Sequence, residues 1–177
     1  MNSFATRLDD STVQFVRILP GPIERVWSYL ADSDKRRQWL GAGALPARVG
    51  ERFSLHIKHA DYWPGEVSAD QRQAMNNACH SMEHVLLALE PPHRLAYSFQ
   101  PEGWEETLVE FRLTPEDTGR VRLTLTHSKL GSRPHAVDAS RGWHGHLDIL
   151  ERKLEGLALP AFADVWPPQS VYDKRYG

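Results

Sequence analysis

The sequence is poor in cysteine and contains no long apolar run. Its single cysteine, Cys79, cannot form an internal disulfide, which is typical of proteins in a reducing compartment. A transmembrane helix needs roughly 18 consecutive apolar residues, and no stretch approaches that length. Residues 1–10 lack the basic and then apolar segments of a signal peptide. We therefore expect a soluble, cytoplasmic protein that does not insert into a membrane.

The sequence also lacks a strong excess of charge of either sign. The formal net charge is −2 at pH 7, so electrostatics gives no reason to expect binding to nucleic acid or to an anionic membrane. The only dense basic run, residues 35–37, follows Asp32 and Asp34 and is interpreted as a solvated helix face. We expect no nucleic-acid partner.

Sequence motifs of the common enzyme classes are missing as well. The chain has no glycine-rich phosphate loop, no dinucleotide-binding glycine pattern, no Gly-x-Ser-x-Gly and no His-Glu-x-x-His. Cys79 would act as a nucleophile only where its surroundings favoured the thiolate, so we expect a structural or exposed thiol. We assign no catalytic residue and expect no cofactor.

Nine histidines make a metal site worth testing. His80 and His84 have the spacing that brings two ligands together on a helix. They lie in a predicted strand, however, where residues four apart are separated by roughly 13 Å. His144 and His146 lie two apart on a predicted helix and cannot both face one ion. We therefore expect no metal site, with His144 facing solvent and His146 bordering the apolar helix face.

The N-terminal part of the chain predicts a strand followed by two short helices. The apolar run at residues 12–19 predicts the strand, which ends at Pro20 because proline cannot donate to a sheet ladder. Pro22 suits the first turn of a helix whose apolar face includes Trp27. A second short helix is predicted to end at Trp39.

Apolar and alternating segments predict five further strands. These segments lie at residues 51–57, 82–89, 94–99, 107–113 and 121–127. The Pro91-Pro92 pair and residues 115–119 are turn signals. Short links between consecutive strands favour an antiparallel meander.

A long helix is predicted after the sheet, because apolar residues from Trp143 to Leu154 recur with helical spacing. The insertion, residues 59–79, is either a lid or binding loop or a surface elaboration with no ligand role. The tail, residues 157–177, is rich in aromatic side chains and should dock onto the body or onto a second subunit, so a homodimer is possible. We expect residues 1–177 to form a single domain with its core at about 12–156.

Several of these features together resemble a known superfamily. The residues that carry the resemblance are Arg17, Pro22, Val26-Trp27, Trp39, Gly50, residues 90–95 and Gly142-Trp143. On them, the chain resembles the START-like, Bet v 1-like (SRPBCC) superfamily and, within it, the activator of Hsp90 ATPase homologue-like family. The resemblance implies an α+β helix-grip fold, in which a curved antiparallel sheet wraps around a long C-terminal helix and two short helices follow strand one. It also implies a cavity between sheet and helix.

The predicted function is binding of a small hydrophobic or amphipathic ligand, lipid-like or polyketide-like, in that cavity. The sheet side of the predicted site consists of Phe53, Leu55, Tyr97, Phe99, Phe111, Leu123, Leu125 and His127. The helix side consists of Trp143, His146, Leu147 and Leu150. Apolar residues would supply affinity, while Tyr97, His127 and His146 would set the ligand's orientation.

Other interpretations stay open at this point. Large aromatic side chains could fill the cavity, and Trp63 and Trp104 could either close its mouth or pack under loops. An enzyme of the polyketide cyclase or hydrolase type would use His127, Tyr97 or Glu83 as acid or base. By family analogy alone, the chain could instead be a co-chaperone-like interaction module with a chaperone partner.

Overall fold

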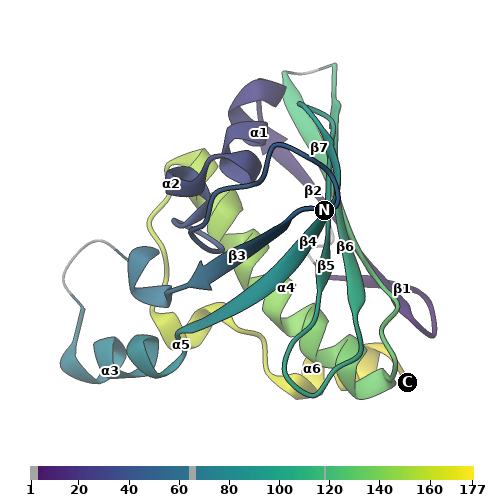
Figure 1. The fold of residues 1–177 in the computed structure, drawn as a ribbon. Coiled ribbons are helices and arrows are strands. Elements are labelled where there is room, and N and C mark those ends of the chain that lie inside the picture. The colour runs from purple at the N-terminus through teal and green to yellow at the C-terminus, as the bar shows by residue number, and fades with distance from the viewer. Residues whose placement is uncertain (1–3, 64–66, 118) are drawn as a thin grey trace.

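The computed structural model describes residues 4–63, 67–117 and 119–177. A curved antiparallel sheet packs against the long helix α4 (Arg133–Glu155), as Figure 1 shows. Along the sheet the order is β1-β2-β7-β6-β5-β4-β3. The strands are β1 (Thr6–Asp9), β2 (Thr12–Pro20), β3 (Arg52–Ile57), β4 (His80–Glu90), β5 (Arg94–Phe99), β6 (Thr107–Pro115) and β7 (Arg120–Ser128). The shorter helices are α1 (Ile23–Ala31), α2 (Ser33–Arg36), the 3-10 helix η1 (His59–Asp61), α3 (Ala69–Asn77), α5 (Phe162–Val165) and α6 (Gln169–Arg175). The predicted α+β helix-grip fold is confirmed.

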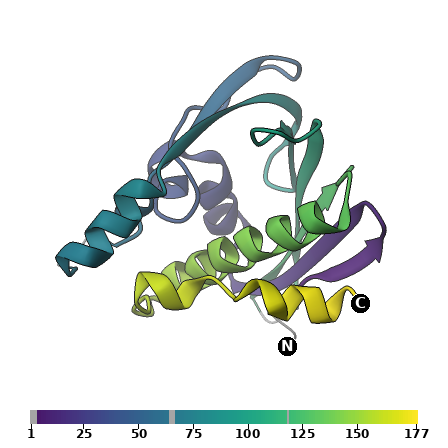
Figure 2. The same ribbon diagram turned by 90° about the horizontal axis from the view of Figure 1, so that it is seen from below.

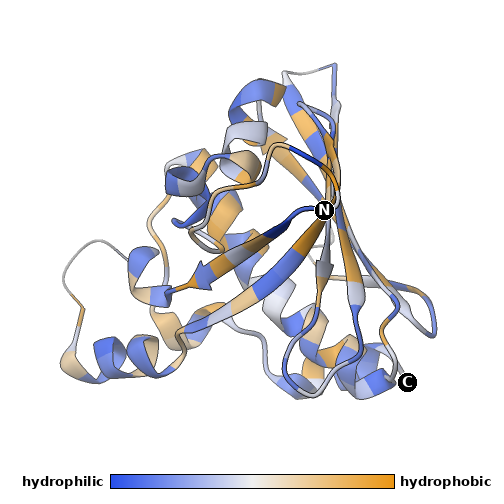
Figure 3. Ribbon diagram, viewed as in Figure 1, coloured by the Kyte–Doolittle hydropathy of each residue, from blue (hydrophilic) through white to orange (hydrophobic). Residues whose placement is uncertain are grey.

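The sheet buries one face, as the alternating sequence pattern predicted. Apolar and polar residues alternate along the strands (Figure 3), and every second residue of β2 is buried. The strand β1 was not predicted, because its four residues are largely exposed and carry no apolar pattern. Of the predicted turn at residues 115–119, Thr118 lies outside the described residues.

The two short helices after β2 are held by buried polar contacts as well as by apolar packing. Val26 and Leu30 of α1 are buried, and Trp39 beyond α2 is completely buried. Arg36 is buried too, which corrects the expectation that residues 35–37 form a solvated face. Its guanidinium donates to the carbonyl oxygens of Leu30 (2.8 Å) and Ala31 (3.2 Å) at the C-terminal end of α1. Unpaired carbonyls at a helix end attract a cation, which explains the burial.

The helix α4 has regular signals at both ends. Ser132 accepts a hydrogen bond from the backbone of His135 at the start, and Gly156 adopts a left-handed conformation at the end (φ 71°). The predicted apolar stripe, from Trp143 to Leu154, is buried against the sheet. Within the described ranges, no helix is both long and apolar enough to span a bilayer.

The tail docks onto its own chain. Figure 2 shows α5 and α6 running beside α4, and Val165, Tyr172 and Tyr176 are buried there. This is one of the two arrangements expected for the aromatic tail. Residues 64–66 of the insertion lie outside the described residues, and α3 occupies most of its second half.

Candidate functional site

A cavity of about 430 Å³ lies beneath the first half of α4. Its wall is formed by α4, by strands β3, β4, β5 and β7, by the insertion and by the tail, together with Leu40 and the loop after β5. The wall residues are Leu40, Ile57, His59, Ala78, His80, Met82, Phe99, Pro101, Trp104, His127, Asp138, Ala139, Gly142, Trp143, His146, Phe162 and Trp166. Most are apolar or aromatic, and none is Lys or Arg.

The structure places four of the twelve predicted ligand-binding residues on this wall: Phe99, His127, Trp143 and His146. The other eight are Phe53, Leu55, Tyr97, Phe111, Leu123, Leu125, Leu147 and Leu150, all buried in the core and none on the cavity wall. The reason is that large side chains fill the centre between sheet and helix. The ring of Phe111 lies 6.3 Å from that of Trp39 and 5.7 Å from that of Trp143.

Part of the remaining wall comes from segments whose role the sequence left open. His59 and Ala78, near the two ends of the insertion, both line the cavity, as do Phe162 and Trp166 of the tail. Trp104 also lines it and stacks on His135 at 4.0 Å between ring centroids. In the sequence, the length of the insertion and the aromatic content of the tail drew attention to these segments. Neither feature shows which side chains contact one another.

The insertion and the tail are fastened to one another and to α4. The indole of Trp63 donates to the carbonyl of Pro160 in the tail (2.9 Å). Lys153 of α4 donates to the carbonyl of Tyr62 (2.6 Å). The bond to Pro160 directs Trp63 toward the tail, and Trp63 is not one of the wall residues. Trp63 therefore packs behind the cavity wall.

His127 lies at the inner end of the cavity with both ring nitrogens already bonded. The indole nitrogen of Trp143 donates to Nδ1 (3.0 Å), so Nε2 carries the hydrogen and donates to the hydroxyl of Thr107 (2.7 Å). Burial lowers the pKa of His127 to about 3, so the ring is neutral. Its predicted role in orienting a ligand would require one of these bonds to be given up.

His146 differs from His127 in having one nitrogen unoccupied. Its Nδ1 lies 2.7 Å from the carbonyl oxygen of Trp39, which can only accept, so Nδ1 carries the hydrogen. The ring stacks near that of His59, at 5.9 Å between centroids. Burial lowers the pKa of His146 to about 3 and that of His59 to about 4.

The acid–base candidates of the enzyme interpretation do not converge on the cavity. Tyr97 is completely buried in the core, where its hydroxyl has no partner in the described part of the chain. Glu83 is exposed and lies 3.6 Å from Arg52 on the surface. Among the described residues, no three His, Cys, Asp or Glu side chains are grouped as a metal site requires.

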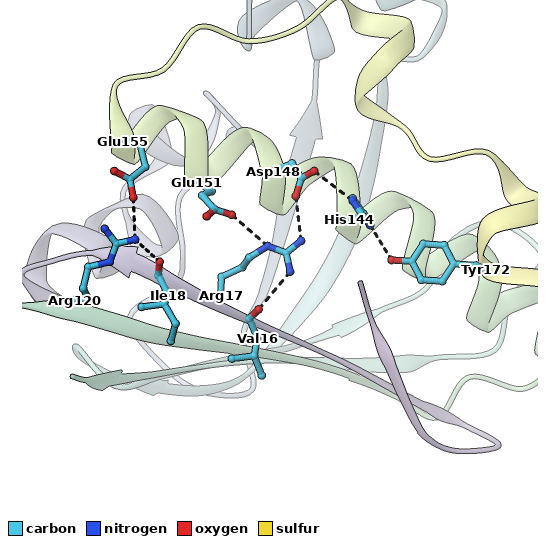
Figure 4. A network of polar contacts seen from close by, with 9 residues as sticks. All are labelled: Val16, Arg17, Ile18, Arg120, His144, Asp148, Glu151, Glu155 and Tyr172. Atoms are coloured by element: carbon cyan, nitrogen blue, oxygen red, sulfur yellow. Dashed lines mark hydrogen bonds and ion pairs between the residues drawn. The ribbon is translucent and has the colours of Figure 1, made fainter. Parts of the chain in front are cut away.

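A polar network ties α4 to β2 and to the tail (Figure 4). Arg17 of β2 is buried and contacts Asp148 (3.0 Å) and Glu151 (3.5 Å) of α4. His144 links Asp148 (3.3 Å) to the hydroxyl of Tyr172 in α6 (2.9 Å). The expectation that His144 faces solvent is therefore wrong, because the tail covers this side of the helix.

Comparisons with known proteins agree with this architecture. Residues 20–155 match the family model described as activator of Hsp90 ATPase homolog 1-like protein. A comparison with curated proteins gave no match. A Bordetella parapertussis protein solved by NMR is 38% identical, with a TM-score of 0.78 over 96% of this chain and 88% of that one.

Two further solved structures share the fold at lower identity. CalU16 from Micromonospora echinospora is 22% identical, with a TM-score of 0.67 over 93% of this chain and 85% of that one. DynU16, encoded in the dynemicin biosynthetic locus, is 20% identical, with a TM-score of 0.64 over 83% of this chain and 48% of that one. The family match and the helix-grip geometry together show that the chain belongs to the activator of Hsp90 ATPase homolog 1-like family, within the START-like, Bet v 1-like superfamily.

Proposed function

We propose that this protein binds a small hydrophobic or amphipathic molecule, lipid-like or polyketide-like, in the cavity beneath α4. The observation that carries the proposal is an apolar, aromatic-walled space of about 430 Å³. Small-molecule sites in proteins occupy about 300–1,000 Å³ and have mostly apolar walls with few polar groups. The likeness to DynU16, from a biosynthetic locus, supports a small organic molecule as ligand.

Within this proposal, the aromatic side chains supply most of the affinity. Phe99, Trp104, Trp143 and Trp166 present large ring surfaces to the cavity. The eight predicted residues in the core would act indirectly, by fixing α4 and the sheet in place. We also infer that residues 1–177 work as one domain, since the insertion and the tail complete the wall.

The sharpest test of the proposal fills the cavity without disturbing the core. A Cβ added at Gly142 meets no atom within 4 Å, and Gly142 lies on the cavity wall. We expect Gly142→Phe to project into the cavity and abolish binding. Its fold should be retained, because replacing a mid-helix glycine removes an unfavourable backbone entropy of about 0.5–1 kcal/mol.

The matched control is Gly142→Ala, which adds one methyl group and should leave most of the cavity free. Binding is measured by titrating each protein with 2-methoxynaphthalene and following tryptophan fluorescence, because three of the wall residues are tryptophans. Binding by the parent and the alanine variant, and its loss in Gly142→Phe, would support the proposal. Equal binding by all three proteins would refute the cavity as the site.

A further inference from the structure

His146 gives the cavity a neutral hydrogen-bond acceptor for which the described part of the chain supplies no partner. With its hydrogen on Nδ1, the neutral ring of His146 leaves Nε2 as a bare acceptor. In the described part of the chain no hydrogen bond to Nε2 is found, and Nε2 is not among the atoms sealed from solvent. Since His146 lines the cavity, this nitrogen is available to a molecule inside it.

The ring of His146 is held in its orientation from several sides. Its centroid lies 5.1 Å from that of Trp166, 5.8 Å from that of Tyr62 and 5.9 Å from that of His59. The bond from Nδ1 to the carbonyl of Trp39 fixes the opposite edge. The acceptor is therefore preorganised, which lowers the entropy lost when a donor binds.

The charge distribution of the wall disfavours an anionic ligand. Among the described residues, the wall includes no Lys or Arg and a single carboxylate, that of Asp138. Both His59 and His146 have pKa values well below 6.5, chiefly because they are buried, so they stay neutral near pH 7. A carboxylate in the cavity would be a buried charge without a counter-ion, which is strongly unfavourable.

We infer that the molecule bound in this cavity is a neutral, hydroxylated aromatic compound whose O–H donates a hydrogen bond to Nε2 of His146. This inference rests on the proposed function and narrows its ligand class. The aromatic wall selects a planar ring system, while the acceptor on His146 selects a hydroxyl group over an ether or a carboxylate. A hydrocarbon or ether of the same shape would leave Nε2 buried without a partner.

The test compares three probes that share one ring system: 2-naphthol, 2-methoxynaphthalene and 2-naphthoate. A neutral hydrogen bond corresponds to a preference of about three- to tenfold. We expect the parent protein to bind 2-naphthol tighter than 2-methoxynaphthalene by that factor, and 2-naphthoate most weakly. Binding of both neutral probes should be lost in Gly142→Phe.

Two substitutions at the acceptor separate its role from packing. His146→Asn places an amide nitrogen near the position of Nδ1, so it keeps a donor for Trp39 but has no atom at Nε2. We expect the preference for 2-naphthol to disappear in this variant. His146→Gln places an amide oxygen near the position of Nε2 and should restore the preference at least in part.

The matched control is His84→Asn, which replaces another buried histidine and keeps a donor for the carbonyl of Ser98. Because His84 is not a wall residue, this variant should leave the ratio of the two neutral affinities unchanged. Equal affinities of the parent for 2-naphthol and 2-methoxynaphthalene, both lost in Gly142→Phe, would overturn the inference and leave the proposed function standing. Tighter binding of 2-naphthoate would also overturn it. If no probe bound the parent, the proposed function and the inference would both fail.

Discussion

At the scale of single residues, the two histidines that face the cavity from strand and helix have different chemical roles. His127 connects Trp143 to Thr107 and offers the cavity only ring carbon atoms. His146 uses one nitrogen for the Trp39 carbonyl and leaves the other free. The sequence placed both on the inner surface by strand parity and helical spacing. It could not show their hydrogen-bond partners, which come from residues 16 to 107 positions away.

The buried histidines also predict how stability depends on pH. Their folded-state pKa values of about 3 lie below the ordinary 6.5, so the unfolded chain binds more protons between these values. The free energy of unfolding should therefore rise with pH from about 3 to 6.5. Each pKa unit corresponds to about 1.4 kcal/mol, so we expect each of the two histidines to cost roughly 2–4 kcal/mol of stability between pH 6.5 and pH 4.

Urea unfolding at several pH values measures this loss, and His127→Phe should make the dependence of stability on pH shallower. A free energy of unfolding that stayed constant between pH 6.5 and pH 4 would contradict the burial of neutral histidines.

The carboxyl group of Asp148 affects stability at lower pH. Burial raises its pKa, but the contacts with His144 and Arg17 outweigh burial and hold it below 3.8. Its stabilising effect is therefore present above pH 3.8 and is lost below that value.

At the scale of elements, the tail forms part of the cavity wall and depends on one close contact with α4. A Cβ at Gly145 would overlap the ring of Trp166, so a glycine is needed for the tail to approach α4 here. Trp166 in turn packs on His146 and lines the cavity. The contact couples the position of the tail to the shape of the site.

We predict that Gly145→Ala displaces the tail from α4. The variant should lose about 1–3 kcal/mol of stability through overpacking, and its tail should be cleaved faster by protease near α5. Binding of the naphthalene probes should weaken, because Trp166 would no longer close the wall. Gly142→Ala, one turn earlier on the same helix, serves as the control, since its added methyl group meets no atom within 4 Å. Unchanged proteolysis in Gly145→Ala would contradict this description of the tail.

The elements themselves were largely predictable from sequence. Strand alternation reflects local chemistry, so β2 to β7 were found close to their observed bounds. The apolar stripe identified α4 but only from Trp143, although the helix begins at Arg133. The strand β1 was missed, because pairing with β2 rather than its own apolar pattern defines it. His144 was misplaced since its burial depends on Tyr172, which lies 28 positions later.

At the scale of the whole molecule, the sequence predicted a cavity but not its location. The alternation of residues along a strand identifies which side chains face inward. It cannot distinguish an inward residue in a filled core from one beside an empty space. Phe111 and Leu147 are fully buried because α4 packs directly on the central strands. The open volume lies toward the N-terminal half of α4, where the insertion and the tail join the strand ends in forming the wall.

The same arrangement bears on assembly. Aromatic side chains of the tail suggested either self-docking or a homodimer, and Tyr172 and Tyr176 are covered within one chain. A homodimer stays a prediction, but the aromatic side chains of the tail no longer give a reason for it. A chaperone partner stays a prediction from family analogy.

The most direct test of ligand binding in this cavity is native mass spectrometry of freshly purified protein, with the parent and Gly142→Phe prepared side by side. The parent should carry a reproducible excess mass that is released on denaturation, and the extract should contain a neutral hydroxylated aromatic or related hydrophobic compound. Gly142→Phe should show the mass of the bare chain. The same excess in both proteins, or a bare parent that also takes up none of the naphthalene probes, would contradict the account.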